Sequence, residues 1–155
     1  MKALNLAFAL CAAASSAHGG NLAVQLSPAE QQITQGQTPH FLVTINATSS
    51  PTKVIKFEDR PDLKDAYVRL TVSKNKKEVE LPIAISDPGP IDEKDYLVLV
   101  TGQKMQFAHD GFPLALHKLP VGTYSVNVRL RADWRLETEP VSSNNVVLKV
   151  VKPHR

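Results

Sequence analysis

Apolar side chains recur at every second position in most hydrophobic segments of the chain. In residues 119–130, a turn with Pro120 and Gly122 leads into such an alternation. Its apolar positions are Tyr124, Val126, Val128 and Leu130. Because successive side chains of a β-strand point to opposite faces, the pattern predicts a strand with one buried and one solvated face.

The same period of two predicts strands along the rest of the chain. It recurs in residues 22–26, 41–45, 66–72, 79–85, 105–107, 112–116 and 146–150. Strands are also expected at residues 52–57, which contain Val54, Ile55 and Phe57, and at residues 96–100, which form a short continuous apolar run. Turn signals separate these segments, and Asp87-Pro-Gly-Pro90 is the strongest of them. We expect residues 66–72 and 79–85 to form a hairpin, and residues 96–100 to pair with 105–107. No window shows sustained helical spacing.

These elements indicate an all-β fold. Seven to nine short strands with Pro and Gly turns are typical of an antiparallel, immunoglobulin-like β-sandwich. In such sandwiches a tyrosine near a turn packs its ring inside and returns its hydroxyl group to upstream backbone, an arrangement called the tyrosine corner. Gly122 and Tyr124 are the candidates for this structural corner.

The start of the chain has the pattern of a secretory signal. Lys2 precedes an apolar run over residues 3–14, and small residues follow it up to Ala17. We expect a signal peptide at residues 1–17 and one sandwich domain at residues 18–155, with cleavage after Gly19 as the alternative. The protein is then exported, to a periplasm or to the extracellular space. No later stretch has the roughly 20 apolar residues of a transmembrane helix.

Composition narrows the function classes. Of the 155 residues, 43% are hydrophobic and 21% are charged, which is typical of a globular domain. The net charge of +3 is spread along the chain, and aromatic residues make up only 6%, so nucleic acid is not the expected partner. The single cysteine, Cys11, lies in the expected signal peptide, which leaves no thiol chemistry for the mature chain.

Three segments resemble the second half of many exported bacterial immunoglobulin-like domains. They are the run Tyr96-Leu-Val-Leu-Val-Thr-Gly102-Gln103, the pattern Leu119-x-x-Gly122-x-Tyr124-x-Val126-x-Val128, and Ser143-Asn144-Asn145-Val146-x-Leu148-x-Val150. The chain is in this respect similar to intracellular-proteinase-inhibitor-like domains and to all-β domains that accompany secreted peptidases. The resemblance implies a non-catalytic sandwich whose loops or strand edges contact a partner. No functional residue can be assigned from this resemblance, because none of the matched positions is a site residue.

We expect no cofactor, and copper is the alternative that the sequence suggests. Cleavage after Ala17 leaves His18 with a free amine beside its imidazole, which is similar to the N-terminal histidine of lytic polysaccharide monooxygenases and periplasmic copper-resistance proteins. The strand Gly122-Thr-Tyr-Ser-Val126 resembles the latter. The further histidine of those proteins is absent from residues 131–145. His109 is the candidate for a second metal ligand, because imidazole suits Cu(II).

The leading hypothesis is binding of another protein through an edge strand or through loops. Arg129, Arg131, Trp134 and Arg135 are the candidate contact residues, since Arg and Trp are frequent in binding hot spots. A protease inhibitor that uses the loop from Asp87 to Asp92 is another alternative. No nucleophile elbow or oxyanion loop is recognisable, so we expect no enzymatic activity.

Overall fold

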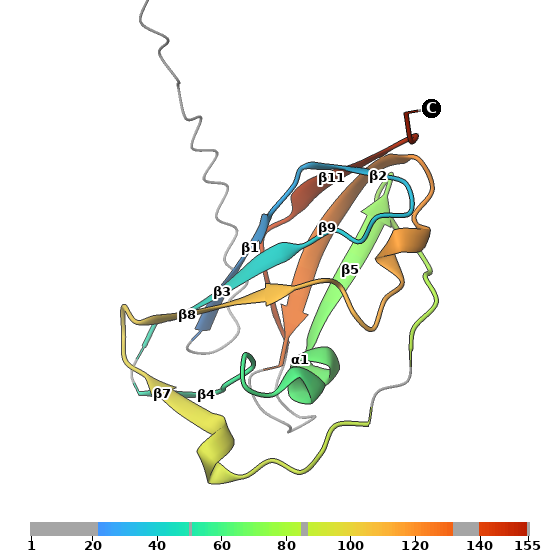
Figure 1. Ribbon diagram of the computed structural model, residues 1–155. Helices are drawn as coiled ribbons and strands as arrows, with labels where there is room; N and C mark the ends of the chain where they lie inside the picture. Colours follow the sequence, from blue (N-terminus) through green and yellow to red (C-terminus); the bar gives the residue numbers. More distant parts are fainter. Residues whose placement is uncertain (1–21, 50, 85–86, 132–139, 155) are drawn as a thin grey trace, which may run out of the picture.

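A computed structural model describes residues 22–49, 51–84, 87–131 and 140–154 of the chain. This part is rich in β-strands and contains one short α-helix (Figure 1). The elements are β1 (Leu22–Pro28), β2 (Gln32–Thr34), β3 (Phe41–Ala47), β4 (Thr52–Ile55), α1 (Pro61–Tyr67), β5 (Val68–Lys74), β6 (Lys77–Glu78), the 3₁₀ turn η1 (Glu93–Asp95), β7 (Tyr96–Leu99), β8 (Lys104–His109), the 3₁₀ turn η2 (Leu116–Lys118), β9 (Gly122–Leu130), β10 (Val141–Ser142) and β11 (Val146–Val151).

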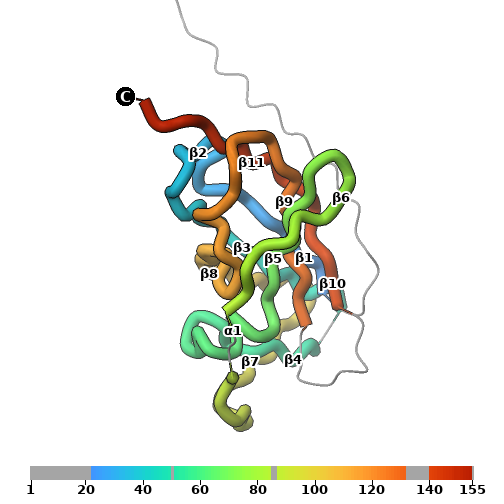
Figure 2. The backbone as a smooth tube through the Cα atoms, turned by 90° about the vertical axis from the view of Figure 1, so that its right-hand side faces the viewer, coloured from blue at the N-terminus to red at the C-terminus, as the bar shows by residue number. Residues whose placement is uncertain are grey.

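The strands form three sheets. The largest has the order β2-β11-β9-β5-β6, with β10 also paired to β9; a second has the order β1-β3-β8; and β4 pairs with β7. All pairs are antiparallel except β2 with β11. In Figure 1, β3 and β8 lie in one layer in front of β9 and β5, and Figure 2 shows the arrangement from the side. The expectation of a predominantly β fold is therefore confirmed.

The core lies between the two larger sheets. The predicted inward positions of β9 are all buried, with Tyr124 at 3% exposure and Val126, Val128 and Leu130 at 0%. Val43 and Ile45 of β3 are also fully buried. Since about 25 cal/mol is gained per Å² of apolar surface removed from water, the alternation that is visible in the sequence is also the main source of stability.

The small β4–β7 sheet continues the β3–β8 pair after a bulge. Asn46 pairs with Lys104, and Thr52 pairs with Leu99. Between these two pairs the chain from β3 to β4 advances six positions, and the chain from β7 to β8 spans five. Gly102 has a φ of +87° at this point, which suits glycine. The predicted hairpin between residues 96–100 and 105–107 is therefore wrong. The two segments are joined by a turn in which Gln103 N–H donates to the Val100 carbonyl oxygen at 2.9 Å, but β7 pairs with β4 and β8 pairs with β3.

Three further sequence expectations are corrected. Residues 61–67 form α1, because Pro61 is suited to the first helical turn, while seven residues are too few to show helical periodicity. The 66–72 hairpin exists, with Asn75 and Lys76 at positive φ, but its returning strand is only Lys77–Glu78. Residues 112–116 contain no strand; Leu114 makes one isolated bridge to Ile83.

Two side chains form hydrogen bonds to backbone groups outside their own segments. The hydroxyl group of Tyr124 donates to the carbonyl oxygen of Pro120 at 2.7 Å, which is the geometry of a tyrosine corner. The amide of Asn144 pairs with the outer edge of β1: Leu26 N–H donates to Asn144 Oδ1 at 2.9 Å, and Asn144 Nδ2 donates to the Leu26 carbonyl oxygen at 3.1 Å. Asn144 thereby links the two larger sheets.

Candidate functional site

The outer edge of β8 is the longest uncovered sheet edge in the described part of the chain. Ala47 N–H donates to the Gln103 carbonyl oxygen, which fixes the alternation of hydrogen-bonded pairs along β3 and β8. By this alternation, the backbone groups of Met105, Phe107 and His109 face β3. The backbone groups of Lys104, Gln106 and Ala108 face away from it, where the described residues supply no neighbouring strand. We call these outward groups the β8 edge.

The other edges of the two larger sheets are shorter or covered. β2 and β6 comprise three and two residues. β1 is longer, but Asn144 satisfies Leu26 on its outer side, and β1 packs against β9, β10 and β11. At the β8 edge the only described contact of this kind is the Lys64 ammonium group, which lies 3.4 Å from the Ala108 carbonyl oxygen. An added strand would thus find free donors and acceptors at Lys104 and Gln106.

Side chains along β8 anchor the strand and leave its outer face open. Phe107 is buried and its ring lies 5.4 Å from that of Phe57. Lys104, Gln106 and Ala108 are exposed. The edge strand is therefore held in place by its inward side chains and does not need a partner to be ordered.

His109, predicted to be a metal ligand, is the last residue of β8 and is 1% exposed. Its Nδ1 accepts from Gly111 N–H at 2.9 Å, so the proton is on Nε2, which donates to the Val68 carbonyl oxygen at 2.8 Å. Burial lowers the pKa of the imidazole, against a smaller opposite effect of the Val68 hydrogen bond. Both ring nitrogens are engaged, so the structure does not place His109 to bind copper.

The described residues contain no group of three or more His, Cys, Asp or Glu side chains arranged to hold a metal ion. His18, the proposed N-terminal chelate, lies outside the described residues. The same holds for Trp134 and Arg135 of the predicted contact surface.

Arg129 and Arg131 lie on the outer face of the largest sheet, and a third arginine joins them. Arg69 of β5 is the direct cross-strand partner of Arg129. Arg69, Arg129 and Arg131 line one cavity together with Ala66, Tyr67 and Pro140. We call the three arginines the arginine cluster. The sequence shows Arg69 at a polar position of a predicted strand, but only the pairing of β5 with β9 places it beside Arg129.

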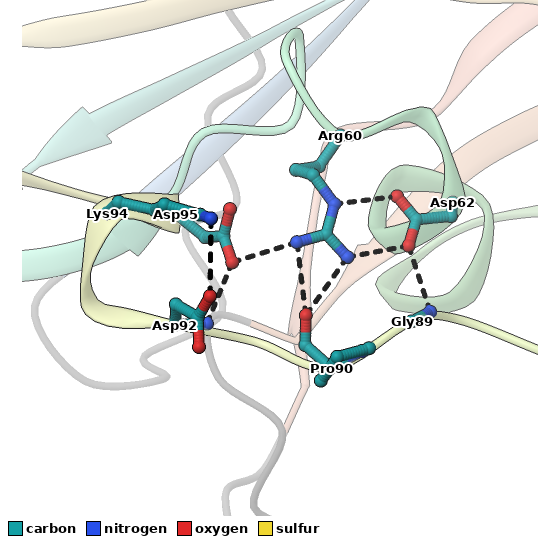
Figure 3. Close-up of polar contacts among 7 residues, drawn as sticks. All are labelled: Arg60, Asp62, Gly89, Pro90, Asp92, Lys94 and Asp95. Carbon is teal, nitrogen blue, oxygen red and sulfur yellow. Dashed lines mark hydrogen bonds and ion pairs between the residues drawn. The ribbon is translucent and has the colours of Figure 1, made fainter.

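The exposed loop of residues 87–92 is held by Arg60 (Figure 3). The guanidinium group donates to both oxygens of Asp62 at 2.9 and 2.7 Å and to Asp95 at 2.8 Å. It also donates to the Pro90 carbonyl oxygen at 3.1 and 3.2 Å, and Gly89 N–H donates to Asp62 at 3.0 Å. This loop, the one named above for a protease inhibitor, thus has a fixed backbone at its centre.

The charges of this network reinforce one another. The hydrogen bonds from Arg60 lower the pKa of Asp62 well below its ordinary value, and the two carboxylates raise the pKa of Arg60. The pKa of Asp95 is lowered first by the backbone N–H of Asp92 and then by Arg60. Groups that are so strongly held in their charged forms are suited to fixing a loop and poorly suited to proton transfer near neutral pH.

Comparison with known proteins yields no family. No protein-family model and no curated protein matches the chain. Among solved structures, the chain is similar to Spo0M, a sporulation control protein from Bacillus subtilis, with 14% identity and a TM-score of 0.49 over 87% of this chain and 51% of that chain. It is also similar to a β-glucosidase from Listeria innocua in complex with glucose, with 14% identity and a TM-score of 0.39 over 83% and 16%.

The chain spans about half the length of Spo0M and a smaller part of the β-glucosidase. At these TM-scores neither likeness bears on the activity, ligands or partners of this chain. Separately, no helix among the described residues is both long and apolar enough to cross a membrane.

Proposed function

We propose that the chain is an exported, non-catalytic module with an immunoglobulin-like β-sandwich that binds another protein by adding a strand of that protein to the β8 edge. The observation that supports this most is the outward backbone of Lys104 and Gln106, which no strand of the described part of the chain pairs, on an ordered strand. In β-augmentation, main-chain hydrogen bonds supply affinity and side-chain contacts along the strand supply specificity. The facing sheets and the Tyr124 corner support the immunoglobulin-like assignment.

The exposed side chains of the β8 edge indicate what kind of strand fits. Lys104 and the nearby Lys64 supply positive charge at the two ends of the edge, and Gln106 lies between them. Opposite charges on facing positions of paired strands contribute roughly 0.2–1 kcal/mol each. The favoured partner segment is therefore extended, with acidic residues toward its ends.

A second candidate function is inhibition of a peptidase by the loop of residues 87–92. It is favoured by the fixed backbone of Gly89 and Pro90, since a loop that is already held in one conformation loses little entropy on binding. A panel of peptidases that is unaffected by excess protein would remove this candidate and leave the β8 proposal untouched.

Photo-cross-linking tests the β8 proposal. A photoreactive amino acid at Lys104, in the full chain expressed in cells that naturally produce it, should form an adduct with the partner. Gln106→Pro removes the outward N–H that the partner needs, while the bonds to β3 come from the neighbouring residues. We expect this change to reduce the adduct at least about tenfold, as the loss of 1.4 kcal/mol or more does.

Gln106→Ala is the matched control, because it keeps the N–H and should keep the adduct. The same photoreactive residue at Val147, exposed on the outer face of the largest sheet, should give none. Thermal unfolding establishes that the proline variant is folded. An adduct that persists in folded Gln106→Pro, or that forms at Val147 and not at Lys104, would refute the proposal.

A further inference from the structure

We propose that the arginine cluster is a binding site for a tetrahedral oxyanion group, a phosphate or a sulfate. The site lies on the outer face of the largest sheet, whereas β8 belongs to the other large sheet. It therefore goes beyond the proposed strand addition and does not depend on it. Three features support the proposal: two arginines are paired across the sheet, a third has a buried donor without a partner in the described structure, and a cavity lies between them.

The first observation is a pair of like charges. Arg69 and Arg129 are direct neighbours across β5 and β9, and both are exposed on the same face. Like charges at such positions are destabilising. None of the ion pairs among the described residues includes either arginine. Glu78 and Glu80 line a neighbouring cavity with them, but without an ion pair. An anion between the two guanidinium groups would remove this repulsion.

The second observation is an unsatisfied donor. Arg131 lies two positions after Arg129, beyond the end of β9, and its backbone N–H donates to the Tyr67 carbonyl oxygen at 2.9 Å. Within the described structure, Nη1 of Arg131 is buried and has no hydrogen-bond partner. A buried donor without a partner is costly, and it is more so when it belongs to a charged group. An acceptor in the cavity would satisfy it.

The third observation is the shape of the space between these groups. The cavity of about 380 Å³ is lined by the three arginines and by Ala66, Tyr67 and Pro140, and the described residues contribute no carboxylate to its wall. This volume exceeds that of a single phosphate or sulfate, so the anion can be part of a larger molecule whose uncharged portion contacts Tyr67 and Pro140.

The chemistry of guanidinium groups selects the class of ligand. Each presents a planar fork of N–H donors that matches two oxygens of an oxyanion. Three such groups supply more donors and more charge than one carboxylate can use, whereas a phosphate or sulfate offers up to four oxygens and up to two charges. The cluster should therefore bind phosphate and sulfate more tightly than a monocarboxylate.

NMR titration tests the site with inorganic phosphate, inorganic sulfate and acetate as probes, with chloride keeping the ionic strength constant. We expect shifts at Arg69, Arg129 and Arg131 that saturate with a Kd of about 1 mM or lower for at least one of the two tetrahedral anions. Acetate should bind at least about tenfold more weakly. Phosphate binding without sulfate binding would point to a phosphorylated ligand, and the reverse to a sulfated one.

Variants separate the site from general attraction of anions. Arg129→Gln should weaken the binding at least about tenfold, because it removes the guanidinium fork at the centre of the cluster. Lys149→Gln, which removes an exposed cation from β11 on the same face, should leave the Kd unchanged. Without anion, Arg69→Gln should unfold at the same or a higher temperature than the natural chain, since it removes the repulsion.

Three results would overturn the proposal: no saturable shifts with either tetrahedral anion, equal affinity for acetate, or equal weakening by Lys149→Gln. The stability of Arg69→Gln provides an independent check. A large loss of stability in that variant would mean that Arg69 has a structural role and not a role in binding.

Discussion

Replacing His109 by leucine should lower the free energy of unfolding by roughly 2–6 kcal/mol at neutral pH. The ring is buried, and it satisfies the Val68 carbonyl oxygen and the Gly111 N–H at the same time. Leucine fills most of the space but leaves both backbone groups without a partner, and each such loss costs about 1–3 kcal/mol. Urea unfolding at pH 7.5 measures the difference.

The same variant should change how stability depends on pH. Burial lowers the pKa of His109 in the folded chain, so its contribution to stability is complete above the ordinary value of 6.5. Below that pH the unfolded chain binds a proton that the folded chain does not, and stability falls by up to about 1.4 kcal/mol per pH unit. The neighbouring charges, Lys64 and Asp110, act on this pKa in opposite directions.

Comparing the natural chain with His109→Leu isolates the contribution of His109 to the pH dependence of stability. The natural chain should lose stability between pH 6.5 and pH 5 more steeply than His109→Leu, whose remaining histidines are unchanged. Parallel curves for the two would mean that His109 is protonated in the folded chain, and the hydrogen bond from Gly111 N–H to Nδ1 would then be wrong.

Gly111→Ala should be the most damaging small substitution, with a loss of roughly 2–5 kcal/mol. Gly111 has a φ of +87°, which costs a residue with a Cβ about 1–2 kcal/mol. An added Cβ would also lie 2.2 Å from Cδ1 of Leu116, a side chain that is 1% exposed. Forcing an extra carbon into a packed core costs typically 1–3 kcal/mol more.

Gly102→Ala is the matched control for this prediction. Gly102 has the same φ of +87°, but an added Cβ there would meet nothing within 4 Å. Thermal or urea unfolding of both variants should therefore show the backbone cost alone at position 102 and a larger loss at position 111. Equal losses would mean that Leu116 does not pack against Gly111 as the structure has it.

The sequence predicted the fold well where the alternation of apolar and polar residues alone determines which face of a strand is buried. The alternation from Tyr124 to Leu130 predicted the burial of β9, because the period of two follows directly from strand geometry. Errors occurred where the pattern was short or where long-range pairing decides. Seven residues of α1 cannot show helical periodicity, and nothing local shows that the strands on either side of the turn at Gly102 pair with β4 and β3 and not with one another.

The candidate sites were less accessible to sequence reasoning. Arg129 and Arg131 were identified from residue type, but Arg69 joins them only because β5 pairs with β9 in one particular register. His109 was interpreted as a metal ligand because imidazole suits Cu(II), and only the structure shows both nitrogens in use. The β8 edge depends on strand order, which alternation does not encode.

Amide hydrogen exchange along β8, followed by NMR, tests the central claim most directly. If β8 is an open edge, the amides of Met105, Phe107 and His109 exchange slowly, since they face β3, while those of Lys104, Gln106 and Ala108 exchange much faster. Exchange at Gln106 as slow as at Phe107 would show that the edge is already covered, and the proposed binding by strand addition would be wrong.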